Sequence, residues 1–339
     1  MTRKQHERCD IQIEPGRTIK LAPEANAEHL NEQQLSDYTE HRAEFIEWLR
    51  TRGKRPEKIE GYSDYTAYET AYRTARFDRW TWTREGRYSI PPTPEHATAY
   101  VENDVALRDV SNSTKGKTEE AIARYMDWTA TVYDVSEWDH DQVFRSGGRD
   151  APRDYLTRDE RRKIREAALA RGDWKTTSLI LTALDAALRP VEVRRATTTW
   201  VDIGNRMLRI PREDSSKNID NWRVSLTSRT ANALREWIDE RDELEVYNGR
   251  DELWLTREGT QYTSRSLARL TRSLARDAGI STRGRTLTLY ALRHSTGTYL
   301  TEERDLKAAK DQLRHKSAKT TMKYDQVPVE DRRDALEKM

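Results

Sequence analysis

The chain is 339 residues long, which leaves room for two domains that each bury a hydrophobic core. Although 35% of its residues are charged and its mean hydropathy is -1.00, its 10 Trp and 15 Tyr supply apolar surface to bury, so we predict a folded, highly soluble protein. The sequence has no apolar run of about 18 residues and no signal-like start, and Cys9 is the single cysteine. These features exclude a membrane-spanning helix, an intrachain disulfide and a cysteine-rich zinc site, and they favour a cytoplasmic protein.

The net charge of +2 hides an asymmetry between the two parts of the chain. Residues 1–150 hold 22 Lys and Arg against 28 Asp and Glu, whereas residues 151–339 hold 38 against 30. The positive excess of the second part fits a polyanionic partner such as nucleic acid, although many cytosolic domains carry an excess of this size.

The first part of the chain is predicted to be helical after a polar start. Residues 1–33 lack sustained periodicity, which predicts an N-terminal arm. Apolar residues then recur at three- and four-residue steps, so we expect residues 34–148 to form a helical domain. The predicted helices run from Leu35 to Arg52, from Tyr65 to Trp82, from Pro94 to about Leu107 and from Lys115 to Tyr133.

The second of these helices carries arginines among aromatic residues. Arg73, Arg76 and Arg79 either follow a DNA phosphate backbone or form the solvated basic face of an ordinary amphipathic helix. The sequence leaves both interpretations open.

A stretch of small and charged residues, 146–153, has the composition of a linker and places a domain boundary near residue 150. The part that follows, 149–327, is predicted to be mostly helical with a meander of three short strands. Its predicted helices are 157–171, 174–187, 228–240, 264–279, 289–302 and 306–315, and its predicted strands are 198–203, 207–211 and 222–226.

Residues of this second part offer the groups that phosphodiester chemistry needs. Breaking and rejoining DNA without metal or nucleotide requires a covalent nucleophile, cations for the transition state and an acid for the departing 5′ oxygen. A tyrosine can supply the first and arginines the second, because a guanidinium binds two phosphate oxygens and keeps its charge. The candidates are Arg189 before a helix that starts at Pro190, its neighbour Glu192, Lys217 in a polar loop between two strands, Tyr290, Arg293, His315 and Tyr324.

The order and spacing of these residues resemble the tyrosine recombinases, also called phage-type integrases, and archaeal members in particular. That signature combines an Arg near Leu-Arg-x-x-Glu, a Lys on a β-hairpin, His-x-x-Arg, Leu-Gly-His-x-Ser and a terminal Tyr. The similar segments here are Leu188–Glu192, Ser216–Asn218 with Trp222–Leu226, Tyr290–Arg293, Leu313–Ser317 and Tyr324–Pro328. The resemblance covers about residues 150–330, and residues 30–145 are similar to the family's core-binding domain.

The resemblance implies a mainly α fold with a small antiparallel β-sheet in the catalytic domain, in a two-domain architecture that clamps double-stranded DNA. It implies about four protomers on two DNA sites, no cofactor, and a tail helix over 328–339 that docks on a neighbouring protomer unless it is a frayed end. The implied roles are phosphate binding by Arg189 and Arg293, a hydrogen bond to the phosphate from His315, protonation of the 5′ oxygen by Lys217, and a 3′-phosphotyrosyl link on Tyr324.

Two positions depart from the family pattern. Tyr290 stands where the family has His, and because a phenol is a poor base near neutral pH, His315 or a neighbour such as His294 would carry more of the proton transfer. Adjacent helical residues point about 100° apart, so His294 does not share the face of Arg293 and a structural role is favoured for it. Arg314 replaces the family's Gly, and we expect its side chain to contact DNA or solvent.

The sequence therefore favours a site-specific DNA recombinase that serves integration, excision or dimer resolution. A type IB topoisomerase-like enzyme remains an alternative, since it would relax DNA as a monomer with a similar active site. A catalytically silent DNA-binding regulator of the same fold is the other. The Tyr290 departure alone supports the regulator, whereas the retention of Lys217, His315 and Tyr324 speaks against it.

Overall fold

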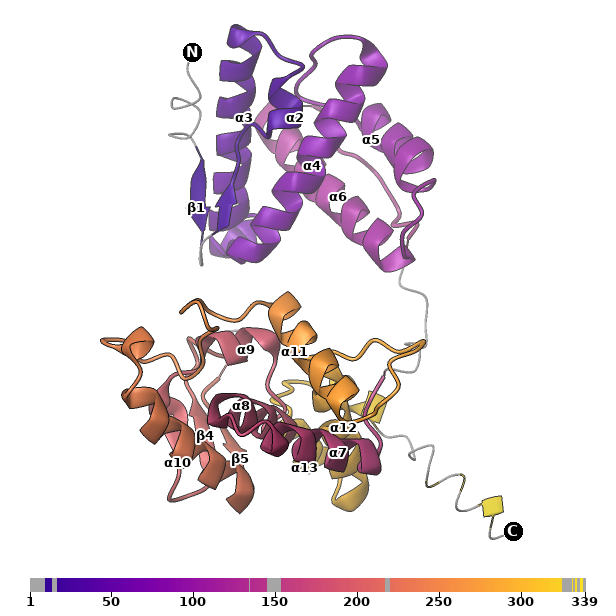
Figure 1. The fold of residues 1–339 in the computed structure, drawn as a ribbon. Coiled ribbons are helices and arrows are strands. Elements are labelled where there is room, and N and C mark those ends of the chain that lie inside the picture. The colour runs from indigo at the N-terminus through magenta and orange to yellow at the C-terminus, as the bar shows by residue number, and fades with distance from the viewer. Residues whose placement is uncertain are drawn as a thin grey trace. The chain divides into compact units, whose positions relative to one another are not determined.

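The computed structural model describes residues 10–13, 17–133, 135–144, 154–216 and 220–324, together with 331, 333, 336 and 337. The chain divides into two compact units, Met1–Arg149 and Asp150–Met339 (Figure 1), and each has its own hydrophobic core. Lys217 and most of the tail 328–339 lie outside the described residues, so the predictions made for them stay predictions. None of the described helices combines the length and the apolar character needed to cross a bilayer.

The first unit is built of helices whose starts are fixed by polar side chains. The side chain of Asn31 accepts a hydrogen bond from the backbone N–H of Gln34 at the start of α3, and Ser63 accepts one from Thr66 at the start of α4. The elements in chain order are β1 (Ile11–Ile13), β2 (Arg17–Ile19), α2 (Glu24–Ala27), α3 (Glu32–Thr51), a 3-10 turn (Pro56–Lys58), α4 (Asp64–Glu85), α5 (Pro94–Tyr100), a π-helical turn (Val101–Val105) and α6 (Asn112–Tyr133).

Residues 11–13 and 17–27 differ from the arm that the sequence predicts, because they form part of the folded first unit. Strands β1 and β2 pair antiparallel with Ile11 opposite Ile19, and α2 follows them. Ile13, Ile19 and Leu21 are buried, and both β2 and α2 contact α4. Two strands of this length contain too few apolar residues to give a periodic signal, so only the contact with α4 reveals them.

The second unit combines helices with a three-stranded antiparallel sheet, which confirms the mainly helical fold with a small sheet. The strand order is β3-β4-β5, and Leu208 of β4 faces Val224 of β5. The elements in chain order are α7 (Arg158–Ala170), α8 (Trp174–Asp185), α9 (Pro190–Arg195), a 3-10 turn (Thr198–Trp200), β3 (Val201–Asp202), β4 (Met207–Ile210), β5 (Trp222–Ser225), α10 (Ser228–Asp242), a 3-10 turn (Glu245–Tyr247), α11 (Ser264–Asp277), α12 (Leu289–Glu303), α13 (Leu306–Gln312), α14 (Ala318–Thr321) and the 3-10 turn η6 (Met322–Tyr324).

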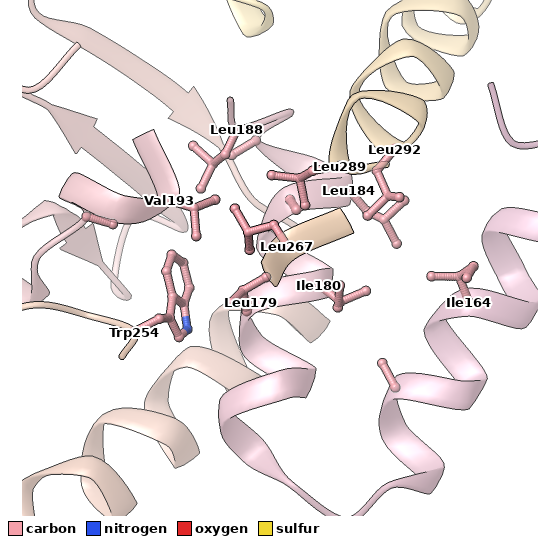
Figure 2. Packing of buried hydrophobic residues seen from close by; sticks show 14 of the residues in the cluster. Ile164, Leu179, Ile180, Leu184, Leu188, Val193, Trp254, Leu267, Leu289 and Leu292 are labelled. Carbon is pink, nitrogen blue, oxygen red and sulfur yellow. The ribbon is translucent and has the colours of Figure 1, made fainter. Parts of the chain in front are cut away.

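Helix α8 lies at the centre of the second unit and packs against α7, α10 and α12. Figure 2 shows Leu179 of α8 in the core cluster with Trp254. The indole N–H of Trp254 donates to Ser178 Oγ at 3.0 Å, so this buried ring keeps its polar atom paired. The core holds the starts of α9 and α12 beside α8, and these helices carry Arg189 and Arg293.

Helix α13 ends at Gln312, earlier than the predicted end at residue 315, because the backbone changes direction there. Arg314 has a φ of 54°, in the left-handed region that favours glycine and that costs another residue about 1–2 kcal/mol. The backbone N–H of His315 donates to the carbonyl oxygen of Lys310 at 3.0 Å and closes the helix end. The turn therefore has a conformation that glycine adopts readily, although an Arg occupies the position.

Candidate active site

Arg189 caps α9, and Glu192 in the first turn of that helix binds it twice. Because Arg189 precedes Pro190, its backbone is extended, with φ -79° and ψ 154°. Its backbone N–H donates to Glu192 Oε2 at 2.7 Å, and its Nη1 donates to Glu192 Oε1 at 2.9 Å. Glu192 therefore orients both the main chain and the guanidinium of Arg189.

Arg314, which the sequence analysis expected to contact DNA or solvent, has its side chain buried beside the same carboxylate. Its side chain is 1% exposed, and its Nη2 donates to Glu192 Oε2 at 2.7 Å. Its Nη1 donates to the carbonyl oxygen of Ala186 at 2.6 Å, and its Nη2 also donates to that of Ala187 at 2.9 Å. The physical reason is the buried charge of Glu192, which needs a second cation in addition to Arg189.

The Glu192 carboxylate stays ionised because of these two arginines. Burial by itself would raise the pKa of Glu192, but the positive charges of Arg314 and Arg189 outweigh it and lower that pKa to about 2. Glu192 is therefore charged throughout the physiological pH range and keeps its ion pairs with both arginines there.

Arg293 approaches this group from α12 and is also buried. Its Nη1 donates to the carbonyl oxygen of Ala187, which Arg314 shares, and its Nη2 donates to that of Leu313. Burial lowers the pKa of Arg293 to about 9, and the positive charges of Arg189 and Arg314 act in the same direction. The guanidinium groups are therefore close enough to repel one another, and an anion between them would relieve that repulsion.

His315 follows the left-handed turn at Arg314 and is 5% exposed. Its Nε2 lies 3.1 Å from Nη2 of Arg293, and its Nδ1 lies 2.9 Å from Oγ1 of Thr321. A guanidinium can only donate, so Nε2 accepts, and the neutral ring carries its proton on Nδ1 and donates it to Thr321. Thr321, which the sequence analysis did not single out, thus fixes the tautomer of His315.

Tyr324 lies in η6 within the same unit and is 4% exposed. Its ring stacks on that of His315 with 6.0 Å between centroids and 10° between planes. The absence of a side chain at Gly297 makes room for it, because a Cβ there would lie 2.9 Å from Cε1 of Tyr324. The candidate nucleophile is therefore packed beside the arginines and histidine of its own chain.

His294 of α12 stands next to the tyrosine, and Tyr290, one helical turn earlier, stands next to His294. Nδ1 of His294 lies 2.9 Å from the hydroxyl oxygen of Tyr324. Tyr290 is 45% exposed, and its ring stacks on that of His294 with 6.1 Å between centroids. The sequence did not predict the contact of His294, because the position of η6 relative to α12 is set by the tertiary fold.

A pocket open to solvent lies against this network. It is lined by Arg189, Glu192, Arg314 and His315 of the network and by Trp222 of β5. The remaining lining residues are Ser215, Ser216, Lys316, Ser317 and Thr320. Lys217 follows Ser216 in the sequence but lies outside the described residues. In the described part of the chain, no group of three or more His, Cys, Asp or Glu side chains is arranged to hold a metal ion.

A stripe of arginines runs along α11, and the sequence analysis missed it. Arg265, Arg269, Arg272 and Arg276 are all exposed and follow one another at steps of four, three and four residues. This spacing puts them on one face over about 16 Å of helix. None of the four side chains forms an ion pair or a hydrogen bond with another described residue. This spacing of four, three and four residues is visible in the sequence and could have identified the stripe.

The arginines predicted on the second helix of the first unit have different surroundings. Arg73 donates to Glu69 at 2.8 Å, and Arg79 donates to Asn26 at 3.1 Å. The side chain of Arg76 is 53% exposed. Of the three, Arg76 is therefore the one most available to a partner.

One comparison with known proteins identifies a family. A model described as the phage integrase family matches residues 154–330, which is just over half of the chain. No curated protein sequence matches the chain.

Three solved structures share the fold at low sequence identity. The XerH site-specific recombinase bound to palindromic difH substrate has a TM-score of 0.61 and 16% identity, covering 87% of this chain and 85% of that one. The Tn1549 transposon integrase in complex with transposon right end DNA has a TM-score of 0.58 and 15% identity, covering 86% and 98%. A lambda integrase dimer bound to a COC′ core site has a TM-score of 0.55 and 13% identity, covering 88% and 82%.

Proposed function

Because the chain belongs to the phage integrase family, the tyrosine recombinases, we propose that it is a site-specific DNA recombinase of archaeal type. It would cleave and rejoin DNA through a 3′-phosphotyrosyl intermediate. The observation that carries the proposal is the contact network of the second unit. In it, Glu192 binds Arg189 and Arg314, the Ala187 carbonyl joins Arg314 to Arg293, and Arg293 contacts His315, which stacks on Tyr324.

The reaction we propose starts with attack by the Tyr324 oxygen on a phosphorus atom of the DNA. The new O–P bond replaces the bond to the 5′ oxygen, which leaves as a hydroxyl after it takes a proton from Lys217. Religation reverses these steps when the 5′ hydroxyl of another strand attacks the phosphotyrosine. Tyr290, at the position of the family's His, would line the approach of the phosphate from α12.

The charges around the pocket would stabilise the transition state. Arg189, Arg293 and Arg314 bring three positive charges and Glu192 one negative charge, which leaves an excess of two. A pentavalent phosphate carries about two negative charges, and groups already fixed around it need no reorganisation during the reaction. His315 would donate to a phosphate oxygen once its Nε2 is protonated and released from Arg293.

Duplex DNA would be bound by basic surfaces outside the pocket. In the second unit, the arginine stripe of α11 has the unpaired cations that phosphate contacts require. In the first unit, we propose Arg76 as a contact, in a core-binding domain over residues 34–148. Residues 149–327 would be the catalytic domain, and the tail 328–339 would dock on a neighbouring copy in a tetramer on paired sites.

The proposal is tested by trapping the covalent intermediate. A duplex is first selected from a random-sequence pool by binding to the wild-type protein, and is then nicked near its centre as a suicide substrate. Wild type should form a DNA adduct that survives denaturing electrophoresis and maps to Tyr324, whereas Tyr324→Phe should bind equally and form none. Specific binding without any wild-type adduct would contradict the recombinase.

The exposed Tyr290 is the observation that keeps a second candidate function, a silent DNA-binding regulator. Equal binding by wild type and Tyr324→Phe with cleavage by neither is the result that supports it. A type IB topoisomerase-like activity would instead appear as relaxation of supercoiled plasmid by a protein bound to DNA as a monomer.

A further inference from the structure

The hydroxyl of Tyr324 has a ring nitrogen of His294 within hydrogen-bond distance, at 2.9 Å from Nδ1. A phenol attacks a phosphate only as it loses its proton, so a group at this distance is placed to receive it. We propose that His294 is the general base that accepts the Tyr324 proton during cleavage and returns it during religation. This inference rests on the proposed recombinase function and assigns a catalytic role within the same site.

Tyr290, at the position where the family has its histidine, is a poorer choice of base. Its side chain is a phenol like the nucleophile itself, so it offers no driving force for the proton transfer near neutral pH. Its ring covers His294, with 6.1 Å between centroids and 28° between planes. Tyr290 therefore positions the imidazole, and the base is His294, one helical turn further along α12.

His315, the other histidine beside Tyr324, is already committed to different partners. Its Nε2 is bonded to Arg293 and its Nδ1 to Thr321. It contacts the tyrosine through stacked rings, with 10° between their planes. This geometry suits a group that acts on the phosphate next to Arg293, which leaves the hydroxyl of Tyr324 to His294.

The surroundings of His294 suit a proton acceptor. Among the described residues, Tyr290 of α12 and Tyr324 of η6 have rings next to it, and His315 stacks on the Tyr324 ring and contacts Arg293. If the phenol donates, Nδ1 accepts and the neutral ring carries its proton on Nε2. Because α12 is anchored in the core by buried Leu289 and Leu292, the imidazole is held on a rigid element.

The proposed step transfers the Tyr324 proton to His294 and exchanges one P–O bond for another. The O–H bond of Tyr324 breaks as its oxygen bonds to phosphorus, and the proton moves to Nδ1 of His294, which becomes an imidazolium. The P–O5′ bond breaks and the 5′ oxygen takes a different proton from the general acid, so no oxidant, metal or nucleotide is consumed. In religation, the phenolate leaves phosphorus and takes its proton back from His294.

The test compares single-turnover cleavage of the selected suicide duplex at saturating protein by wild type, His294→Gln and Thr301→Ala. His294→Gln should lower the cleavage rate by about 100-fold or more, the usual range for a general base, with DNA affinity and melting temperature unchanged. Thr301→Ala lies two turns further along α12, where its hydroxyl bonds to the Gly297 carbonyl of the same helix, and it should stay within about threefold of wild type. The His294→Gln rate should keep rising with pH into the alkaline range, because hydroxide would then have to take the tyrosine proton.

A second measurement separates loss of the base from a distorted site. Replacing Tyr324 by 3,5-difluorotyrosine gives a more acidic hydroxyl, which should restore cleavage by His294→Gln about tenfold or more and change the wild-type rate little. Cleavage by His294→Gln within about threefold of wild type, or a loss that the fluorinated tyrosine does not reverse, would overturn the proposal. If the wild-type protein forms no adduct, the proposed recombinase function itself is wrong, and this outcome is distinct from a failure of the His294 proposal.

Discussion

Glu192 accepts hydrogen bonds from the backbone N–H and Nη1 of Arg189 and from Nε and Nη2 of Arg314. Two cations are therefore held by one buried carboxylate, and a third, Arg293, shares the Ala187 carbonyl with Arg314. In the proposed reaction, Arg314 would thus act on the phosphate through the residues that it positions. A glycine at its place, as in the family signature, would adopt the same left-handed turn but supply neither the charge nor these bonds.

Replacing Arg314 by Met should destabilise the second unit by about 3–5 kcal/mol at pH 7, because the variant breaks a buried ion pair. The lowered pKa of Glu192, about 2, means that its ionised form contributes stability above the unfolded pKa and loses it as the pH falls through the folded pKa. The variant lacks much of this contribution, so its deficit should stay nearly constant from pH 7 down to the unfolded pKa and should shrink as the pH falls further toward about 2. Calorimetry of the full chain over that range measures it.

Two controls sharpen the Arg314 experiment. Arg314→Gly removes the strained φ as well as the charge, so it should be less destabilised than Arg314→Met by about 1–2 kcal/mol. Adding Glu192→Gln to Arg314→Met removes the unpaired charge and should recover part of the loss. A deficit that does not change with pH would mean that Glu192 is not the partner that matters.

At the scale of elements, η6 packs on α12 through Tyr324 and Gly297. A methyl group at Gly297 would lie 2.9 Å from both Cε1 of Tyr324 and Cδ1 of Leu313, closer than side chains pack, so Gly297→Ala should displace η6. Cleavage should fall by about 10–100-fold, since a displacement of about 1 Å has effects of this order. Single-turnover cleavage with the selected duplex is the measurement.

Thr301→Ala provides the matched control, because it lies one turn further along α12 and its hydroxyl bonds only within the helix, to the Gly297 carbonyl. It adds no atom beside Tyr324 and should cleave at close to the wild-type rate. If Gly297→Ala cleaves as fast as this control, the close approach of α12 and η6 does not position the nucleophile.

Sequence patterns predicted the elements whose signals are local. Thr157 and Glu160 form a capping box in the sequence, and the structure has that box at the start of α7. The paired strands β1 and β2 were not predicted because they are short. The end of α13 was predicted three residues too late because no local sequence pattern predicts a left-handed backbone at an Arg. Both features depend on tertiary contacts, so no periodic pattern in the sequence predicts them.

The same division holds for the candidate site. The residues themselves are visible in the sequence through the order of Arg189, Arg293, His315 and Tyr324. Their partners are not, because the inward direction of Arg314 and the contact of His294 with Tyr324 join segments whose relative position only the fold determines. The sequence placed Arg314 on the surface, whereas the structure buries it beside Glu192.

At the scale of the whole molecule, the positive charge is concentrated in the second part of the chain, and part of it forms the stripe on α11. Arg269 and Arg272 lie in the middle of that stripe. If they contact DNA phosphates, Arg269→Ala combined with Arg272→Ala should reduce the slope of log affinity against log salt by about 2. The loss should be similar for the selected duplex and for a scrambled duplex, because phosphate contacts carry no direct sequence information. Binding titrations at several salt concentrations test this.

Arg162 of α7 is the control for the stripe, because it is also exposed but already pairs with Asp159 and Glu166. A paired cation releases few counterions, so Arg162→Ala should leave the salt slope unchanged while the double variant on α11 lowers it. An equal slope for the double variant and wild type would remove α11 from the DNA interface. A loss confined to the selected duplex would instead assign α11 to base recognition, since contacts with base edges depend on sequence.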